Sequence, residues 1–276
     1  MIILKLKTQI TDTVPREAES INPENIRGLT DSEISALPIW YGNRQQTVGH
    51  YFDIDTSEAS KGDLSKIVIQ GDVSLFKRLG QGMTEGEMEI QSSVGFHAGS
   101  FMKGGLLTIK GDAGDWLGSH MEGGRIVVEG SVGHYVGAAQ RGRPIGMQGG
   151  TIMVKGNAGQ MLGSRMGRGL IAVEGDCGDV VGFKMVAGTI VVRGKADRLP
   201  GANMARGTII IMQRPKLLPT FYYSCEYRPI MWKLIYAELK QNGFDLDESY
   251  RDAVFARYTG DANTGGKGEI LTCLST

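Results

Sequence analysis

Histidine and cysteine are the side chains here that most readily bind metals or transfer protons, and their spacing argues against both roles. The four histidines are His50, His97, His120 and His134. The last three occupy different positions in the repeat described below, so stacked repeats would not bring them into one metal site. The three cysteines are Cys177, Cys225 and Cys273, and they form no CxxC pair. The sequence therefore predicts buried or unreactive thiols, no metal site and no catalytic residue.

Two further patterns imitate functional sites. Residues 80–86, GQGMTEG, resemble a phosphate-binding loop but lack its Lys-Ser/Thr ending. Regularly spaced methionines could bind copper, yet such regularity is more typical of a packed core. We therefore interpret both the glycines and the methionines as structural.

Glycine recurs at a fixed interval. Of the 41 glycines among 276 residues, 32 lie between Lys66 and Gly207. The strand-like segments of successive repeats begin at Glu87, Leu106, Arg125, Thr151, Leu170, Thr189 and Thr208. The period is about 19 residues, and one insertion lengthens the repeat that begins at Arg125. A degenerate and longer segment precedes the series near Lys66, so the sequence is one repeat array with non-repeat ends.

Every repeat has the same internal order. Alternating apolar residues are followed by small residues and glycines, then a methionine and a closing glycine, as in LLTIKGDAGDWLGSHMEGG at residues 106–124. Alternation that ends on glycine indicates a short strand with one buried face. A methionine takes the same place in each repeat, at Met83, Met102, Met121, Met147, Met166, Met185 and Met204. We expect the last six to form a ladder in the core.

A single repeat of this length cannot bury its own apolar face, whereas stacked repeats share one interior. The expected fold is mainly β: a right-handed parallel β-helix, a single-stranded solenoid of about seven coils of roughly 19 residues. The predicted organisation is an N-terminal capping region at 1–65, the β-helix at 66–212 and a C-terminal α-helical tail at 213–276.

Opposite charges alternate at one outward position of five successive repeats, at Lys110, Glu129, Lys155, Glu174 and Arg193. In-register stacking would place each charge beside the opposite sign. A second outward position is apolar in the later repeats, at Val127, Met153, Ala172, Val191 and Ile210. Because an apolar stripe of this length is rarely left in water, we expect the tail or another subunit to cover it.

The N-terminal flank carries helix signals. Residues 22–28 are typical of a capped helical turn, and Thr30 begins a capping box for a short helix that ends before Pro38. Residues 48–54 are a candidate strand to cover the first coil, whose open end would otherwise be an exposed edge.

The C-terminal flank begins after Met212, where the glycine period stops. Residues 229–242, PIMWKLIYAELKQN, predict an amphipathic helix. Residues 247–258 predict a second helix. One or both would lie over the apolar stripe.

The charge balance excludes some function classes. Thirty basic and thirty acidic residues cancel, which argues against nucleic acid or an anionic membrane as partner. The start, MIILKLKTQITD, lacks a signal peptide, and no stretch approaches the ~20 apolar residues of a membrane span, so we expect a cytoplasmic protein.

One part of the chain departs from this neutrality. Residues 141–206 hold 10 basic and 4 acidic side chains, and the insertion in the fourth repeat contributes Arg141 and Arg143. This basic end is either a solvated face or a docking surface for an acidic subunit or a polyanionic ligand.

The repeat at residues 106–124, preceded by Gly104-Gly105, resembles that of the β-helix domain of glutamate synthase large subunits and of the C subunit of formylmethanofuran dehydrogenase. The chain's length, its N-terminal region and its short tail are more similar to the dehydrogenase subunit. LPTF at 218–221 and RYTGDANTGGKGEIL at 257–271 look more like the bacterial branch of that family.

The resemblance implies a structural and docking subunit of the formyltransferase/hydrolase complex of methylotrophic bacteria. That complex moves a formyl group from tetrahydromethanopterin to a methanofuran-type carrier and hydrolyses it to formate. The implied partners are a hydrolase-like A subunit, a B subunit and a formyltransferase-like D subunit, with zinc and the carrier bound by other subunits and no cofactor bound by this one. The alternative is the C subunit of the archaeal tungsten or molybdenum dehydrogenase, which converts CO2 to formylmethanofuran and whose molybdopterin and iron–sulfur clusters also lie on other subunits.

The carriers of these pathways bear glutamate chains. The resemblance therefore suggests that Arg141 and Arg143 contact a polyglutamyl tail. Two rival interpretations remain: a solenoid enzyme acting on a polysaccharide, which would need paired acidic residues on one outer face, and a glutamate-synthase-like spacer domain that acts alone.

Overall fold

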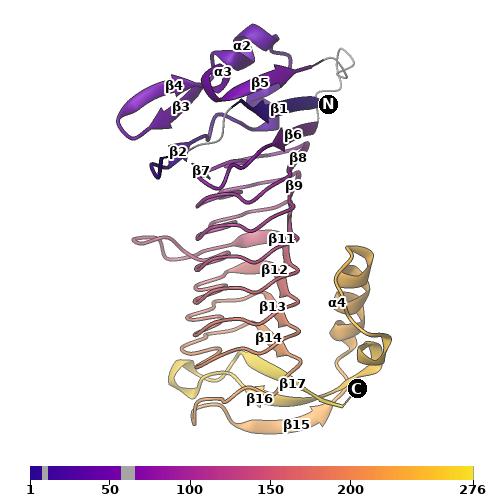
Figure 1. The fold of residues 1–276 in the computed structure, drawn as a ribbon. Helices are drawn as coiled ribbons and strands as arrows, with labels where there is room; N and C mark the ends of the chain where they lie inside the picture. Colours follow the sequence, from indigo (N-terminus) through magenta and orange to yellow (C-terminus); the bar gives the residue numbers. More distant parts are fainter. Residues whose placement is uncertain (8–11, 57–65, 276) are drawn as a thin grey trace.

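The computed structural model describes residues 1–7, 12–56 and 66–275 and is mainly β (Figure 1). Eight strands run parallel, each paired with the next: β6 (Lys66–Gln70), β8 (Glu87–Ile90), β9 (Leu106–Ile109), β10 (Arg125–Val128), β11 (Gln148–Val154), β12 (Arg168–Val173), β13 (Thr189–Val192) and β14 (Thr208–Ile211). The strands recur at the period of the glycines. One repeat therefore supplies one strand.

The strands stack with equivalent residues opposite one another. Ile126 of β10 lies opposite Leu107 of β9 and Ile152 of β11, and all three are fully buried. A second row of parallel bridges joins the small apolar residue of each repeat to its equivalent, through Val73, Val94, Ala113, Val132, Ala158, Cys177 and Ala196. Each repeat thus meets its neighbour at two places, and identical positions lie above one another.

The seven repeat methionines, Met83 to Met204, are fully buried. The glycine that closes a repeat leaves room for the methionine of the repeat before it. A Cβ on Gly169 would lie 2.8 Å from Cε of Met147, and one on Gly188 would lie 2.9 Å from Cε of Met166. Both glycines also have a left-handed φ, near 103° and 95°, so two separate constraints favour glycine there.

The N-terminal end of the stack is covered by β1 (Ile2–Leu6), which lies parallel to β6, and β5 (Phe52–Asp55) pairs antiparallel with β1. The predicted strand at residues 48–54 is therefore only partly right. Residues Val48–Tyr51 form helix α3, and the strand that follows does not contact β6 in the sheet. The alternation of residues 2–6 marks β1 as a strand, but nothing local shows that it returns to pair with β6.

A four-stranded sheet beside this end has the order β4-β3-β2-β7, with β2 (Arg16–Glu17), β3 (Pro38–Tyr41), β4 (Arg44–Thr47) and β7 (Phe76–Lys77). The two predicted helix starts are confirmed. Asn22 caps α1 (Pro23–Ile26), and Thr30 forms the capping box of α2 (Asp31–Ser35), which ends before Pro38. The predicted boundary between residues 65 and 66 follows residues 57–65, which lie outside the described residues.

The C-terminal tail extends the sheet. Strand β17 (Glu269–Ser275) lies parallel to β14, with Glu269 opposite Thr208 and Ile270 opposite Ile209. Strands β16 (Val254–Thr259) and β15 (Tyr223–Tyr227) follow it antiparallel. The whole sheet therefore has 13 strands in the order β15-β16-β17-β14-β13-β12-β11-β10-β9-β8-β6-β1-β5.

The tail contains fewer helices than predicted. Helix α4 (Ile230–Gln241) forms as expected, but residues 247–258 do not form an α-helix. They form a 3-10 turn, η1 (Glu248–Asp252), and strand β16, and a second turn, η2 (Ala262–Thr264), follows. Pairing with β17 provides hydrogen-bond partners that outweigh the weak helical pattern of this segment.

Helix α4 stands alongside the later strands (Figure 1). Its buried residues Trp232, Tyr236 and Leu239 share a core with the apolar stripe. Val191 and Ile210 of that stripe are fully buried. Of the two expected covers, the chain's own tail is the one observed. In the described part of the chain, none of the helices has the length and apolar character needed to cross a membrane.

Candidate functional site

The insertion in the fourth repeat, residues 140–146, projects from the stack just before β11 (Figure 1). The imidazole of His120 anchors it. Nε2 of His120 accepts a hydrogen bond from the backbone N–H of Gln140 at 3.0 Å, and the ring also hydrogen-bonds to the backbone of Ile145. Burial, and then the positive charge of Arg143, lower the pKa of His120, so the ring is neutral when it holds the loop.

Aromatic side chains stack beneath the insertion. The rings of Trp116 and Tyr135 are 4.3 Å apart and 7° from parallel, and His97 stacks on the other side of Trp116 at 6.1 Å. Phe101 stacks on His120 at 5.0 Å, and the guanidinium of Arg143 lies 5.1 Å from the Phe101 ring centre. Stacking of repeats brings the first three rings together, because His97, Trp116 and Tyr135 occupy one position of successive repeats.

The insertion and the stacked rings enclose a groove of about 820 Å³. Arg141 and Gln140 line one side, and Arg165 and Phe183 line the part nearest the later repeats. Arg143 is not among the lining residues, because its guanidinium packs on Phe101 instead. The structure thus places the two predicted arginines on one loop but gives them different surroundings.

Gln140, which lines the groove, belongs to a buried hydrogen-bond network without a carboxylate. Nε2 of Gln140 donates to Oγ of Ser119 at 3.0 Å, and Ser119 shares a hydrogen bond of 2.8 Å with Ser100. Burial, and next the charges of Arg78 and Lys77, lower the pKa of His97. Among the described residues that line the groove, none is acidic. The arrangement can stack on planar groups and attract anions, but it lacks a paired acid and base.

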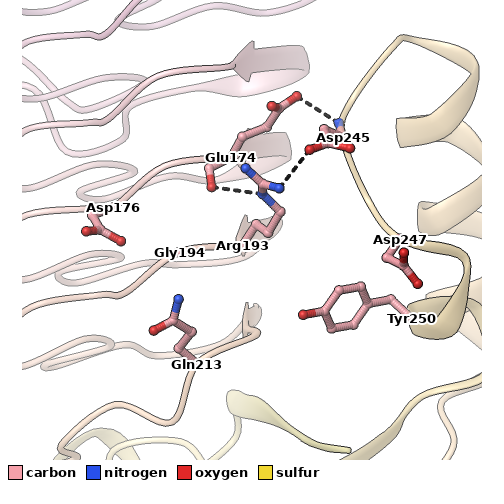
Figure 2. A pocket seen from close by; sticks show the side chains of 8 residues that line it. All are labelled: Glu174, Asp176, Arg193, Gly194, Gln213, Asp245, Asp247 and Tyr250. Atoms are coloured by element: carbon pink, nitrogen blue, oxygen red, sulfur yellow. Dashed lines mark hydrogen bonds and ion pairs between the residues drawn. The ribbon is translucent and has the colours of Figure 1, made fainter. Parts of the chain in front are cut away.

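A second cavity, of about 600 Å³, separates the stack from the loop after α4 (Figure 2). The buried carboxylate of Glu174 accepts a hydrogen bond from the backbone N–H of Asp245 at 2.8 Å. Arg193 bridges the two segments, since its Nη1 lies 2.8 Å from the Asp245 carboxylate and its Nε donates to the carbonyl oxygen of Glu174 at 3.1 Å. These contacts fasten the tail to the stack.

The same contacts explain why the alternating charges form ion pairs along only part of the stack. Lys110 and Lys155 both pair with Glu129, at 2.8 and 3.7 Å. Glu174 and Arg193 turn to Asp245 instead of to each other's side chains. Only the first part of the alternation therefore forms ion pairs along the stack.

The described residues contain no group of three or more histidine, cysteine or carboxylate side chains that could hold a metal ion. Cys177 is buried in the second row of bridges, and burial raises the pKa of its thiol. Cys225 is exposed, and Cys273 is half-buried.

Sequence reasoning missed the aromatic stack. The signal was present, because positions 97, 116 and 135 are equivalent in three successive repeats and each carries a ring. The histidines do not share a repeat position. A search for histidine alone therefore misses the position that His97, Trp116 and Tyr135 have in common.

A sequence model of the GXGXG motif family matches residues 75–241, which is more than half of the chain. The chain belongs to the GXGXG motif family. Among its relatives, the C subunit of the tungsten-containing formylmethanofuran dehydrogenase 2 of Methanothermobacter marburgensis is 40% identical over 99 residues, 36% of each chain. The C subunit of the molybdenum-containing formylmethanofuran dehydrogenase 1 of Methanosarcina barkeri is 40% identical over 81 residues, 29% of this chain and 27% of the relative. The aligned segments thus span about a third of these relatives or less.

One solved structure matches along nearly the whole chain. It is a chain from the X-ray crystal structure of the formyltransferase/hydrolase complex (FhcABCD) of Methylorubrum extorquens in complex with methylofuran. The match has a TM-score of 0.86 and 33% sequence identity, and covers 98% of both chains. The family resemblance inferred from the repeat is confirmed by these comparisons.

Proposed function

We propose that this chain is the C-type subunit of a cytoplasmic formyltransferase/hydrolase complex. That complex would transfer a formyl group from tetrahydromethanopterin to a methanofuran-type carrier and hydrolyse it to formate. The observation that carries the proposal is the 98% coverage, in both directions, of a chain from such a complex at 33% identity. The matched chain shares the flanking regions as well as the repeats, which a common repeat alone would not require.

We propose further that residues 66–212 form a right-handed parallel β-helix of about seven coils of roughly 19 residues, between a cap at 1–65 and a tail at 213–276. Two rows of parallel pairing in each repeat support this architecture, since a single row would leave the rest of the repeat without fixed stacking. The ladder of Met102, Met121, Met147, Met166, Met185 and Met204 would fill its interior.

The proposed role is structural and docking rather than catalytic. The groove under the insertion supplies stacking rings and cations without a carboxylate partner, a composition that suits binding. Zinc and the carrier would lie on other subunits, and the partners would be a hydrolase-like A subunit, a B subunit and a formyltransferase-like D subunit.

Arg141 and Arg143 would attract the polyglutamyl tail of the carrier. Both side chains are exposed on the projecting loop, where a long anion could reach them. Changing both to glutamate should raise the KM of the complex for a long-tailed carrier more than for a short-tailed one. Equal effects on both carriers would contradict this assignment.

A second candidate is the C subunit of a tungsten or molybdenum formylmethanofuran dehydrogenase, which converts CO2 to formylmethanofuran. The 40% identity to such subunits favours it, although over only 36% of the chain. Its complex would also hold molybdopterin and iron–sulfur clusters on other subunits.

Purification of the tagged full-length chain from its own cells, under native conditions, tests both candidates. Copurification of a hydrolase-like and a formyltransferase-like subunit without an iron–sulfur subunit would support the first. An added iron–sulfur subunit would support the second, and a chain without partners would contradict both.

A further inference from the structure

Seven non-glycine residues at one corner of successive repeats adopt a left-handed backbone. They have φ between 57° and 65° and are Arg78, His97, Trp116, Tyr135, Met161, Val180 and Leu199. The backbone N–H of each of the first six donates to a carbonyl of the following repeat, as from Val180 to Arg198 at 2.8 Å. We call these residues the corner column.

A side chain at such a position is costly. The left-handed region is unfavourable for an L-residue other than glycine, and a β-branched residue such as Val180 is especially unfavourable there. Gly182 and Gly201 show that this chain uses glycine at other left-handed positions of the same repeats. A second position of the repeats is also left-handed without glycine, at Phe101, His120, Arg165, Lys184 and Asn203. The strain alone therefore assigns no role, and the surroundings of the corner column must do so.

The later part of the corner column forms the floor of an apolar groove of about 600 Å³. Met161, Val180 and Leu199 form this floor, and the linker residues Leu217–Pro219 line the opposite side. Leu199 is 42% exposed, which is high for a leucine between two apolar walls. Met161 also lines the groove under the insertion, so the two grooves adjoin at this residue.

The rim of the two adjoining grooves is positively charged. Its basic lining residues are Arg141, Arg165, Arg198 and Lys216. Among the described lining residues, the acidic one is Asp179, and its carboxylate pairs with Arg198 at 2.6 Å. An apolar floor with an uncompensated basic rim is complementary to a chain that carries both apolar and acidic side chains.

We propose that the two adjoining grooves, from His97 to Leu199, together bind one extended acidic segment of a partner subunit. The partner is a subunit of the complex named above, so the inference rests on the proposed function. Strand stacking at roughly 4.8 Å per repeat makes the part of the column from His97 to Leu199 about 24 Å long, which an extended peptide of about seven residues would span. A polyglutamyl tail fits these grooves less well, because it has no apolar side chains for the floor formed by Met161, Val180 and Leu199. On this assignment Arg141 faces the partner segment, whereas Arg143 lies outside the groove and stays available to the carrier's tail.

The test uses the tagged full-length chain expressed together with its complex partners. The main variant carries Val180→Gly and Leu199→Gly, which remove the apolar side chains and relieve the left-handed strain. The matched control is Asn203→Gly, at an exposed left-handed position, φ 58°, outside both grooves. Its backbone N–H bond to Asp261 does not need the side chain. A third variant, Lys216→Glu, reverses one charge on the rim.

We expect the double variant to retain at most a tenth of the partner that the wild type retains, while its urea midpoint of unfolding stays unchanged. The control should retain the wild-type amount. Lys216→Glu should also retain less. A photo-crosslinking residue in place of Leu199 should join to a partner peptide that contains acidic and apolar residues.

The outcomes separate the two proposals. A wild-type chain that brings no formyl-transferring partner would overturn the proposed function and, with it, the identity of the bound segment. If the wild type assembles and the double variant assembles equally well, the groove assignment alone is overturned. Binding of poly-L-glutamate that the double variant loses would likewise overturn it, since the groove would then hold the carrier's tail.

Discussion

The clearest test of the stacking concerns Gly123, which closes the third repeat. Its φ lies outside the left-handed region, so conformation alone would permit alanine. A Cβ there, however, would lie 2.3 Å from the carbonyl oxygen of Lys103 in the preceding repeat. Backbone cannot move aside as a side chain can, so Gly123→Ala should force the two repeats apart.

The expected cost can be worked from this contact. Overpacking of this kind costs about 1–3 kcal/mol. The amides of Glu122 and Gly123 donate to the carbonyl of Met102 at 2.8 and 3.2 Å, and weakening one such bond costs about 1 kcal/mol more. Alanine also raises the free energy of unfolding by roughly 0.4–1 kcal/mol, because it restricts the unfolded chain more than glycine does. The free energy of unfolding should therefore fall by about 1–3.5 kcal/mol.

The matched control is Gly142→Ala in the projecting insertion. Gly142 has a left-handed φ of 83°, but a Cβ there would meet no atom within 4 Å. Gly142→Ala should therefore lower the free energy of unfolding only through the strained backbone conformation. After subtraction of the same effect of alanine on the unfolded chain, the loss is about 1 kcal/mol or less. Gly123→Ala should lower the urea midpoint, followed by circular dichroism, by about 0.3–1.2 M at an m-value on the order of 3 kcal/mol per M. Equal stability of the two variants would refute the close approach of backbones between repeats.

Three further predictions concern single side chains. Because the folded-state pKa of His120 is lowered, the unfolded chain binds its proton first, so stability should fall below about pH 6.5 by up to about 1.4 kcal/mol per pH unit, and His120→Asn should flatten that slope in urea unfolding. Glu174→Ala should lower the free energy of unfolding by about 1–3 kcal/mol and speed proteolysis of the tail, because the backbone N–H of Asp245 loses its acceptor. Glu174→Gln keeps an acceptor oxygen and should avoid most of that loss. A thiol reagent should modify Cys225 in the native protein and Cys177 only after unfolding; native labelling of Cys177 would contradict its burial.

Much of the repeat region could be read directly from the sequence. The pairs Ile126 with Ile152 and Ile190 with Ile209 follow from the period, because stacking places equivalent residues opposite each other. The caps at Asn22 and Thr30 could be predicted too, since their hydrogen bonds join residues three apart. Such features depend on local or periodic information.

The flanks were harder to predict. Residues 254–259 begin with three consecutive apolar side chains, which suit a helix or a strand about equally, and pairing with residues 269–275 decides for the strand. Residues Gly268 to Leu271 take the place of a further repeat on β14, although they lie far beyond it along the chain. A Cβ on Gly268 would lie 2.5 Å from Cε of Met204, the relation that closing glycines have to methionines within the array.

The candidate site shows the same division. The insertion and its arginines are visible in the sequence because they interrupt a strict period. The anchoring of the insertion by His120, the packing of Arg143 on Phe101 and the bridge between Arg193 and Asp245 are not visible. Each of these contacts depends on the direction in which a loop leaves the stack, and the repeat period does not specify that direction.

The sequence by itself determined the period, the buried positions and the family of this protein, because a repeat imposes one environment on every copy of a position. Only the tertiary structure decided how the ends are closed and which faces remain open. Those outcomes depend on contacts between segments without a common period, and their energies arise only when folding brings the segments together.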